Sequence, residues 1–320
     1  MKLSVVIPAY NEAENIKSIL SDLAESIRQS SEIVTNYEIV IVDDASSDGM
    51  FEKLAEAPFP KVSVIRLSRR SGSHIAIRAG LDYVSGDIVL CIAADGQDDP
   101  WAIKRMIEKW HSGCEVVWAL RKARDNEGRI SSLLARFFYS LLGFFGEVES
   151  KIDLSRADFY LLDKKIVKSI ISCRETNTSL FGLIVWLGYS QGSIEYERKP
   201  RRSGNSKWTF KSKLQLAKDW IIAFSGIPLK IMTLVGFLVA GVGFAYAIII
   251  IAKSVLWGSP VQGWSSVMTA ILLLGGGQMI MLGILGEYLW RTLDESRNRP
   301  HYFVEKHLSV LDNLSIETHE

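Results

Sequence analysis

Cysteine is scarce in this chain of 320 residues, and the three that it has show no pairing pattern. Cys91, Cys114 and Cys173 are odd in number, and none stands in a Cys-x-x-Cys spacing or in a metal-type pairing with histidine. A disulfide scaffold and a zinc module of the usual spacing are thereby excluded. We expect all three cysteines to be reduced residues of the core.

Several sequence signatures are also missing. No Gly-x-Gly-x-x-Gly and no Gly-x-x-x-x-Gly-Lys follows a predicted strand, which excludes the usual dinucleotide-binding and P-loop sites. The formal net charge of +1 hides a basic segment between Lys199 and Lys218, so the average charge says little about partners. We expect no nucleic-acid partner. The N-terminus does not resemble a secretory signal, because its apolar run Leu3–Ile7 is short and is interrupted by Pro8.

What the chain does have is enough apolar residues, 48% of the total, to form a large core. Up to about residue 120, short β-branched runs alternate with helix-length amphipathic stretches, and the clearest runs are Leu3–Ile7, Glu38–Val42 and Ile88–Ile92. Strands that alternate with helices predict an α/β fold with a mostly parallel sheet.

Two long uncharged runs follow in the second half of the chain. Ile231–Ala252 and Val267–Gly286, which we extend to about residue 289, are each near the roughly 20 residues that cross a bilayer as a helix. Basic residues are dense before the first run and after the second, whereas the connecting loop carries only Lys253. This pattern predicts an integral membrane hairpin with both termini in the cytoplasm. The alternative is a central hairpin of a large soluble protein.

Further segments bear on the membrane. Residues 131–146 are dominated by Leu and Phe and predict an interfacial helix, with a buried core helix as the alternative. Residues 211–228 mix basic and aromatic side chains and predict a juxtamembrane amphipathic helix. The run Gly275–Gly277 would allow close helix packing, which leaves a homo-oligomer open.

Polar residues follow each of the clearest strands. Pro8–Glu12 follows the first strand, and Asp43–Gly49 begins at the end of the second. The alternative interpretation of each segment is an ordinary turn, and in Pro8–Glu12 this turn would have Asn11 as a helix N-cap. Adjacent carboxylates repel one another, so Asp43 and Asp44 are better explained if they accept hydrogen bonds from a nucleobase or ribose. After the third strand, Asp95 and the oxygen-bearing residues behind it suit a hard divalent cation holding a diphosphate.

With these segments in place, the chain resembles inverting family 2 glycosyltransferases of the GT-A fold, and within them the polyprenyl-phosphate glycosyltransferases, which include dolichol-phosphate mannose synthases and bactoprenol glucosyltransferases. The resemblance runs from residue 2 to about residue 305. The motifs that carry it are VVIPAYNE at 5–12, VDDASSDG at 42–49, LSRRSG at 67–72, ADGQDDP at 94–100, ADF at 157–159, RSGNSKW at 202–208 and GEYLWR at 286–291.

The resemblance implies roles for particular residues. Asp95 and Gln97 match positions that hold Mg²⁺ or Mn²⁺ against the donor diphosphate. Asp158 matches a catalytic base or acceptor-orienting residue, and we expect positioning or electrostatic stabilisation to matter as much as proton removal, because a phosphate acceptor with a second pKa near ~6 is already mostly ionised. Asp95 also matches the nucleotide-sugar pocket, and the other residues that match this pocket are Pro8, Tyr10, Glu12, Asp43, Asp44 and Arg69. Two residues match the lipid-phosphate site, Arg202 and Lys207.

The chain departs from the family pattern at three places. Ala93 stands where many relatives have the first aspartate of Asp-Ala-Asp, which removes one carboxylate beside the expected metal. Arg70, Ser71, Ser73 and Ala157 also differ from the residues that are common in relatives, and they border the donor pocket. The transferred sugar therefore need not be glucose or mannose.

The resemblance thus implies an enzyme that moves a sugar from a nucleotide sugar, with a UDP-sugar favoured over a GDP-sugar, to undecaprenyl or dolichyl phosphate at the cytoplasmic face of a bacterial inner membrane. Its product would need a flippase as a partner. The alternatives are a catalytically degenerate scaffold that binds nucleotide sugar, which Ala93 favours, and a processive polysaccharide synthase, which the missing Gln-x-x-Arg-Trp motif and the two spans oppose.

The expected organisation has four parts. A GT-A domain at 1–210 is followed by the amphipathic helix at 211–228, by two membrane helices within 229–290 and by a cytoplasmic tail at 291–320.

Overall fold

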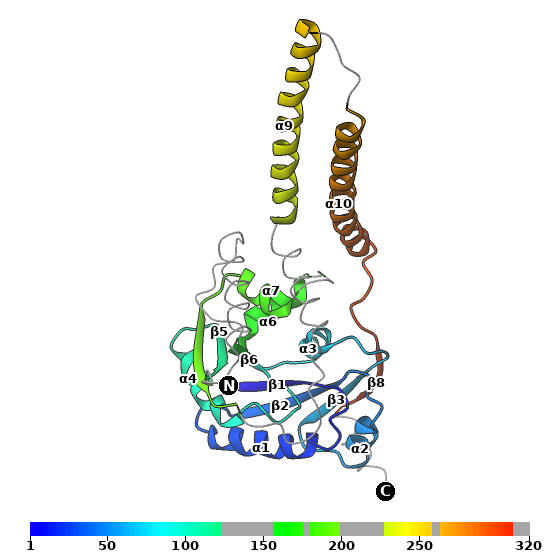
Figure 1. Ribbon diagram of the computed structural model, residues 1–320. Coiled ribbons are helices and arrows are strands. Elements are labelled where there is room, and N and C mark those ends of the chain that lie inside the picture. Colours follow the sequence, from blue (N-terminus) through cyan, green and yellow to red (C-terminus); the bar gives the residue numbers. More distant parts are fainter. Residues whose placement is uncertain (123–155, 174, 176–178, 199–226, 258–262, 310–320) are drawn as a thin grey trace.

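The computed structural model describes residues 1–122, 156–173, 175, 179–198, 227–257 and 263–309. An eight-stranded sheet lies between two layers of helices, and a pair of long helices, α9 and α10, extends away from this body (Figure 1). The predicted α/β fold is confirmed.

Four parallel strands form the centre of the sheet, and its order is β7-β5-β6-β4-β1-β2-β3-β8. β6 is antiparallel to both of its neighbours and β8 is antiparallel to β3, so the sheet is mixed. The strands are β1 (Lys2–Ala9), β2 (Asn36–Asp43), β3 (Val62–Leu67), β4 (Ile88–Cys91), β5 (Val116–Arg121), β6 (Ala157–Asp163), β7 (Gln191–Tyr196) and β8 (Val304–Leu308).

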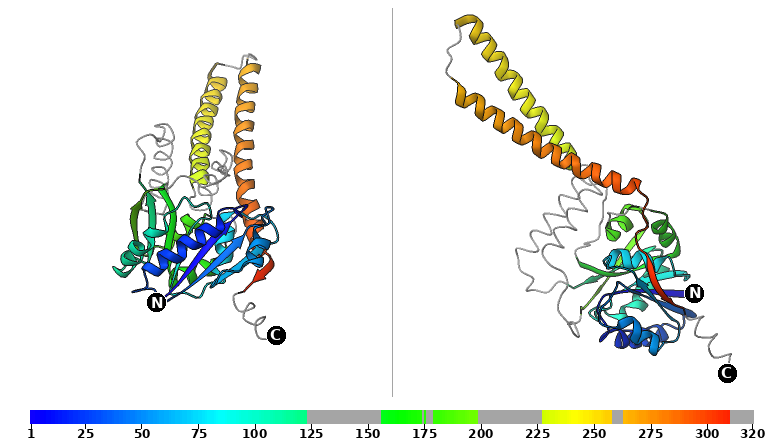
Figure 2. Two further views of the ribbon diagram at one scale, coloured as in Figure 1. Left: turned by 90° about the horizontal axis from the view of Figure 1, so that it is seen from below. Right: turned by 90° about the vertical axis from the view of Figure 1, so that its right-hand side faces the viewer.

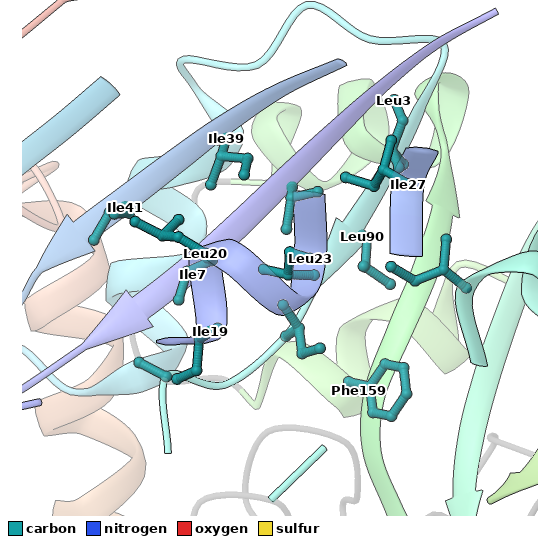
Figure 3. Close-up of a cluster of buried hydrophobic side chains, with 14 of the residues drawn as sticks. Leu3, Ile7, Ile19, Leu20, Leu23, Ile27, Ile39, Ile41, Leu90 and Phe159 are labelled. Carbon is teal, nitrogen blue, oxygen red and sulfur yellow. The ribbon is translucent and has the colours of Figure 1, made fainter. Parts of the chain in front are cut away.

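Helices cover both faces of the sheet, which explains why the central strands are continuous apolar runs rather than alternating ones. One face carries α1 (Ile16–Gln29), α2 (Met50–Glu56) and α4 (Ile103–His111). Figure 3 shows Leu20, Leu23 and Ile27 of α1 against the core side chains of this face. The other face carries α3 (Ser73–Leu81), α6 (Lys164–Ser172) and α7 (Leu180–Trp186).

α3 lies very close to the sheet at Gly80. A Cβ atom added there would stand 2.4 Å from Val6 Cγ1 and 3.1 Å from Val42 Cγ2, which is closer than packed atoms allow. Glycine at this position therefore lets α3 rest directly on β1 and β2. The loop that begins α3 is consequently held beside the carboxyl ends of these strands.

The two long helices are α9 (Ile227–Trp257) and α10 (Trp264–Ser296), and each contains one of the uncharged runs of the sequence. Within the part of the chain that the structure describes, no helix combines the length and the apolar character that a membrane span needs. The two predicted spans therefore stay a prediction.

The C-terminal segment contains a strand that the sequence analysis did not anticipate. After α10 the chain returns to the sheet, and β8 pairs with β3 at what would otherwise be an open edge (Figure 2). The interfacial helix predicted at 131–146 and positions 211–226 of the juxtamembrane helix lie outside the described residues. No disulfide joins the three cysteines, as the sequence predicts.

Candidate active site

The carboxyl ends of β1 and β2 lie at the same edge of the sheet, because the strands are parallel and Ala9 pairs with Asp43. Hydrogen bonds join the loops that follow them. Asn11 N donates to Ser46 Oγ at 2.9 Å, and Asn11 Oδ1 accepts from Ser47 N at 2.8 Å. The loops therefore form one unit at the edge where open α/β sheets bind ligands.

Asn11 is not the N-cap of α1, so that alternative reading is wrong. The N-cap position is Asn15, which makes no side-chain capping bond. Asn11 has φ of +53°, a left-handed conformation that asparagine adopts more readily than most residues. The buried Glu12 accepts from Asn15 Nδ2 at 2.7 Å through its Oε2 atom. These residues shape the loop that begins with Tyr10.

Asp43 is fully buried at the end of β2. Its Oδ1 atom accepts from Ser46 N at 2.8 Å, and its Oδ2 atom accepts from Arg66 Nη1 of β3 at 2.9 Å. Burial raises the pKa of the Asp43 carboxyl, against the lowering effect of Ser46 and Arg66. Ser46, and after it Arg66, thus favour the charged form of this buried carboxylate.

Asp44, which is also buried, fixes the loop before α3. Its two oxygens accept from Ser71 N at 2.6 Å and from Gly72 N at 2.8 Å. The adjacent carboxylates therefore both have protein donors. Since a carboxylate has about four acceptor positions, these contacts leave capacity for the hydroxyl or imide groups of a ligand.

An aromatic–cation contact lies on the same side of the pocket. The guanidinium carbon of Arg70 stands 4.1 Å from the centre of the Tyr10 ring, a cation–π distance. Arg69, the residue that the family resemblance matches to the donor pocket, is its neighbour in the chain, and both arginines are exposed. Because the two arginines are consecutive in a loop, the sequence does not indicate which of them faces Tyr10.

Beyond β4, the loop from Ala93 to Pro100 is held by its own carboxylates. Asp98 accepts from Ala93 N at 3.2 Å and from Tyr196 OH at 3.0 Å, so it is a structural residue of the loop. Asp95 is partly exposed, and its Oδ1 atom accepts from Gln97 N at 3.1 Å. Asp95 is therefore partly accessible in the loop that follows β4.

Asp95 fits a divalent cation, and Gln97 fits it less well. Gln97 Oε1 accepts from Arg198 Nη2 at 3.0 Å, so a positively charged guanidinium lies against the oxygen that was expected to hold a metal. Among the described residues no group of three His, Cys, Asp or Glu side chains forms a metal cluster. One carboxylate together with diphosphate oxygens and water is nevertheless a usual coordination for Mg²⁺.

The remaining predicted residues are placed only in part. Asp158 lies on β6, which pairs with β4 through Cys91 and Tyr160. The pairs of this antiparallel ladder end with Cys91 and Tyr160, and Asp158 lies two residues from Tyr160. The pairing of β6 with β5 is irregular here, so Asp158 is the extra residue of a bulge. Arg202 and Lys207 lie outside the described residues.

His74, to which the sequence analysis assigned no role, links the donor side of the site to α7. Its Nδ1 atom accepts from Leu180 N at 3.3 Å, and its ring meets that of Phe181 edge to face. Burial, helped by the nearby positive Arg78, lowers the pKa of His74 to about 4. The folded protein therefore holds this imidazole neutral.

This lowered pKa predicts a loss of stability in acid. In the unfolded chain His74 takes up a proton near its ordinary pKa of 6.5, whereas the folded form resists it down to about 4. This contribution to stability is complete above pH 6.5 and is lost as the pH falls through this window, by about 3 kcal/mol. His74→Asn, which keeps an acceptor for Leu180 N, should remove this part of the slope when unfolding in detergent is followed against pH. His111→Asn, at an exposed position of α4, should keep it, and equal slopes for all three proteins would contradict the prediction.

The fold and the site together define a GT-A-like α/β protein. Residues 4–164 match the family described as Glycosyl transferase family 2, and residues 227–291 match the GtrB C-terminal hairpin. The chain belongs to glycosyl transferase family 2 and is a glycosyltransferase.

Similar proteins are found over nearly the whole length of the chain. An uncharacterized glycosyltransferase of Synechocystis sp., sll0501, is 37% identical over 99% of this chain and 98% of its own. The SfII prophage-derived bactoprenol glucosyl transferase of Shigella flexneri is 35% identical over 96% of this chain and 98% of its own. A glucosyl-3-phosphoglycerate synthase from Mycobacterium tuberculosis, solved with Mn²⁺, UDP-glucose and phosphoglyceric acid, is 18% identical with a TM-score of 0.49, over 69% of this chain and 78% of that one. That last likeness is too weak to carry a conclusion.

Proposed function

We propose that this glycosyltransferase moves a sugar from a nucleotide sugar, with UDP favoured over GDP, to a polyprenyl phosphate at the cytoplasmic face of a bacterial inner membrane, with inversion of the anomeric centre. The observation that carries the proposal is the meeting of Tyr10, Asp43, Asp44 and Asp95 at one edge of the sheet. Relatives named bactoprenol glucosyl transferase, which align over nearly the whole chain, support the lipid acceptor.

The donor would bind across the loops that follow β1, β2 and β4. Tyr10 offers an aromatic face and Asp43 and Asp44 offer acceptors for the nucleoside, while Arg70 lies beside them as a cation for the diphosphate. Asp95 would hold a divalent cation, Mg²⁺ or Mn²⁺, which when bound neutralises charge on the departing nucleoside diphosphate. Inversion requires the acceptor on the opposite side of the sugar, and the bulge of β6 at Asp158, two residues from the pair that ends the β4 ladder, supports Asp158 as the residue that orients it.

The acceptor is a lipid, and the two long helices suit a bilayer. Large apolar side chains are exposed along both of them, among them Phe237 at 75%, Val242 at 71% and Ile280 at 68%. Exposed apolar surface of this extent needs a non-aqueous partner. We place α9 and α10 in the membrane, with both termini in the cytoplasm, and Arg202 and Lys207 near the lipid phosphate.

The test is transfer of labelled sugar to polyprenyl phosphate by the full-length protein in detergent. UDP- and GDP-sugars are supplied in turn with Mn²⁺, Mg²⁺ or a chelator, and lipid-linked label is separated from donor by organic extraction. Metal-dependent formation of a lipid-phosphate sugar with inverted configuration is expected. Binding of nucleotide without transfer across the panel would instead support the degenerate scaffold that Ala93 favours, and a polymeric product would support a processive synthase.

A further inference from the structure

Arg66 contacts both the loop of the proposed nucleotide site and the C-terminal strand β8. Its Nη1 atom donates to Asp43 at 2.9 Å, its Nη2 atom donates to Ser46 O at 3.0 Å, and its Nε atom donates to Glu305 at 3.1 Å. The Arg66 side chain is only 18% exposed. All three edges of the guanidinium are thus used, two by the pocket and one by β8.

Glu305 reaches Arg66 because β8 is bulged at this point. Arg66 pairs with Lys306 and Leu67 pairs with Val304, so Glu305 is the extra residue between them. A bulge re-aims the side chain of its extra residue, and bulges are frequent beside active sites. Without the bulge, the alternation of a regular strand would direct positions 304 and 306 to one face and 305 to the other.

Three further contacts fix β8 where it meets the body. Ser68 N donates to Phe303 O at 2.9 Å, Tyr302 OH donates to Asp82, the residue after α3, at 2.6 Å, and Leu308 packs against the core. Glu305 therefore belongs to an ordered edge strand, although it lies 239 residues from Arg66 in the sequence. It also lies outside both segments of the chain that match known families.

We propose that Glu305 is a positioning residue for donor binding, because it holds the Arg66 guanidinium in the orientation that supports Asp43 and the Ser46 carbonyl. This inference rests on the proposed function, since it takes the pocket at Asp43 as the nucleotide site. It has a structural consequence. The strand that follows the helical hairpin completes the donor pocket, so the two parts of the chain are joined at the site as well as by the backbone.

The charges explain why the pair would affect binding rather than chemistry. Asp43 has a second carboxyl group, Asp48, near it, and Arg66 forms an ion pair with Asp43. If Glu305 no longer holds the Nε edge, the guanidinium gains freedom to turn, and the loop from Asp43 to Ser46 loses a fixed support. The reacting sugar and the lipid phosphate are not contacted by this pair, so their steps should proceed as before.

The test uses the full-length protein in detergent and compares Glu305→Gln, Glu305→Asp and Arg66→Lys. UDP, UDP-glucose and GDP-mannose are titrated by calorimetry. Initial transfer rates are then measured with UDP-glucose or GDP-mannose, whichever the unaltered protein uses as donor. Glu305→Gln is expected to raise the donor Kd and KM by about three- to ten-fold, with kcat and the acceptor KM within about two-fold. Glu305→Asp keeps the carboxylate and should recover part of the affinity.

Two controls separate this role from simple strand stability. Lys306→Gln alters the next residue of β8, which faces Glu52 and Phe51, and should leave the donor KM within about two-fold. The double variant of Glu305→Gln with Arg66→Lys should be no weaker than Arg66→Lys alone, because both changes remove one interaction.

The proposal is overturned if Glu305→Gln binds nucleotide like the unaltered protein, or if it loses kcat and thermal stability with no change in donor KM. If Glu305→Gln does not fold, the titration of Glu305→Asp decides, and a donor Kd equal to that of the unaltered protein overturns the proposal in the same way. Failure of the unaltered protein to bind any of the three nucleotides would instead count against the proposed function.

Discussion

Asp158→Asn is expected to reduce kcat by about 10²–10³-fold, while nucleotide binding stays close to that of the unaltered protein. Asp158 lies at a bulge of β6, two residues from Tyr160, which pairs with Cys91 at the end of β4. A carboxylate at this position can orient the lipid phosphate or stabilise positive charge on the sugar. The amide keeps the shape of the side chain and removes its charge, so the effect should fall on turnover. Initial rates at saturating donor and acceptor, together with calorimetry for the nucleotide, measure it.

The matched control for Asp158 is Asp163→Asn at the other end of the same strand. Asp163 caps α6 by accepting from Lys165 N, and it also accepts from Trp110 Nε1 at 2.9 Å. Its replacement should lower thermal stability by about 1 kcal/mol and leave kcat nearly unchanged. A near-normal turnover for Asp158→Asn would remove that residue from the catalytic step.

Asp95→Asn is expected to lower kcat/KM by about 10²–10³-fold and to weaken the metal dependence of nucleotide binding. Asp95 is a partly accessible carboxylate of its loop, whereas Asp98 is buried against Tyr196. Because Ala93 supplies no second carboxylate, the cation would rely on Asp95 and on the donor itself. Calorimetric titration of UDP with and without Mn²⁺ gives a readout that is independent of turnover.

Gln97→Ala provides the comparison within the same loop. Since Gln97 Oε1 accepts from Arg198, we expect a smaller effect than for Asp95, at most about ten-fold, with the metal dependence of binding retained. Equal losses in the two variants would show that Gln97 shares the metal. An Asp95→Asn protein whose UDP binding responds to Mn²⁺ as before would show that the cation is held elsewhere.

The sequence alone was sufficient for the parts of this protein that depend on local pattern. Apolar strands such as Leu3–Ile7 and Ile88–Ile92 are recognisable because helices cover both faces of the sheet, so that every position favours an apolar residue. Parallel pairing then brings the residues after β1, β2 and β4 to one edge, and the motifs at 8–12, 43–49 and 94–100 could be read as one site. The uncharged runs of α9 and α10 can also be recognised in the sequence, because each is one continuous stretch of the chain.

Only the tertiary structure decided which side chains meet within that site. Gln97 contacts Arg198 across 101 residues, and Glu305 contacts Arg66 across 239, so no spacing in the sequence could have paired them. The contact of Arg70 with Tyr10 depends on the path of one loop, and the direction of the Glu305 side chain depends on one extra residue in β8. Local pattern determines that a strand forms and which face it buries. Register, bulges and edge pairing are set by contacts between distant segments, and it is those contacts that decide the partners of each charged group.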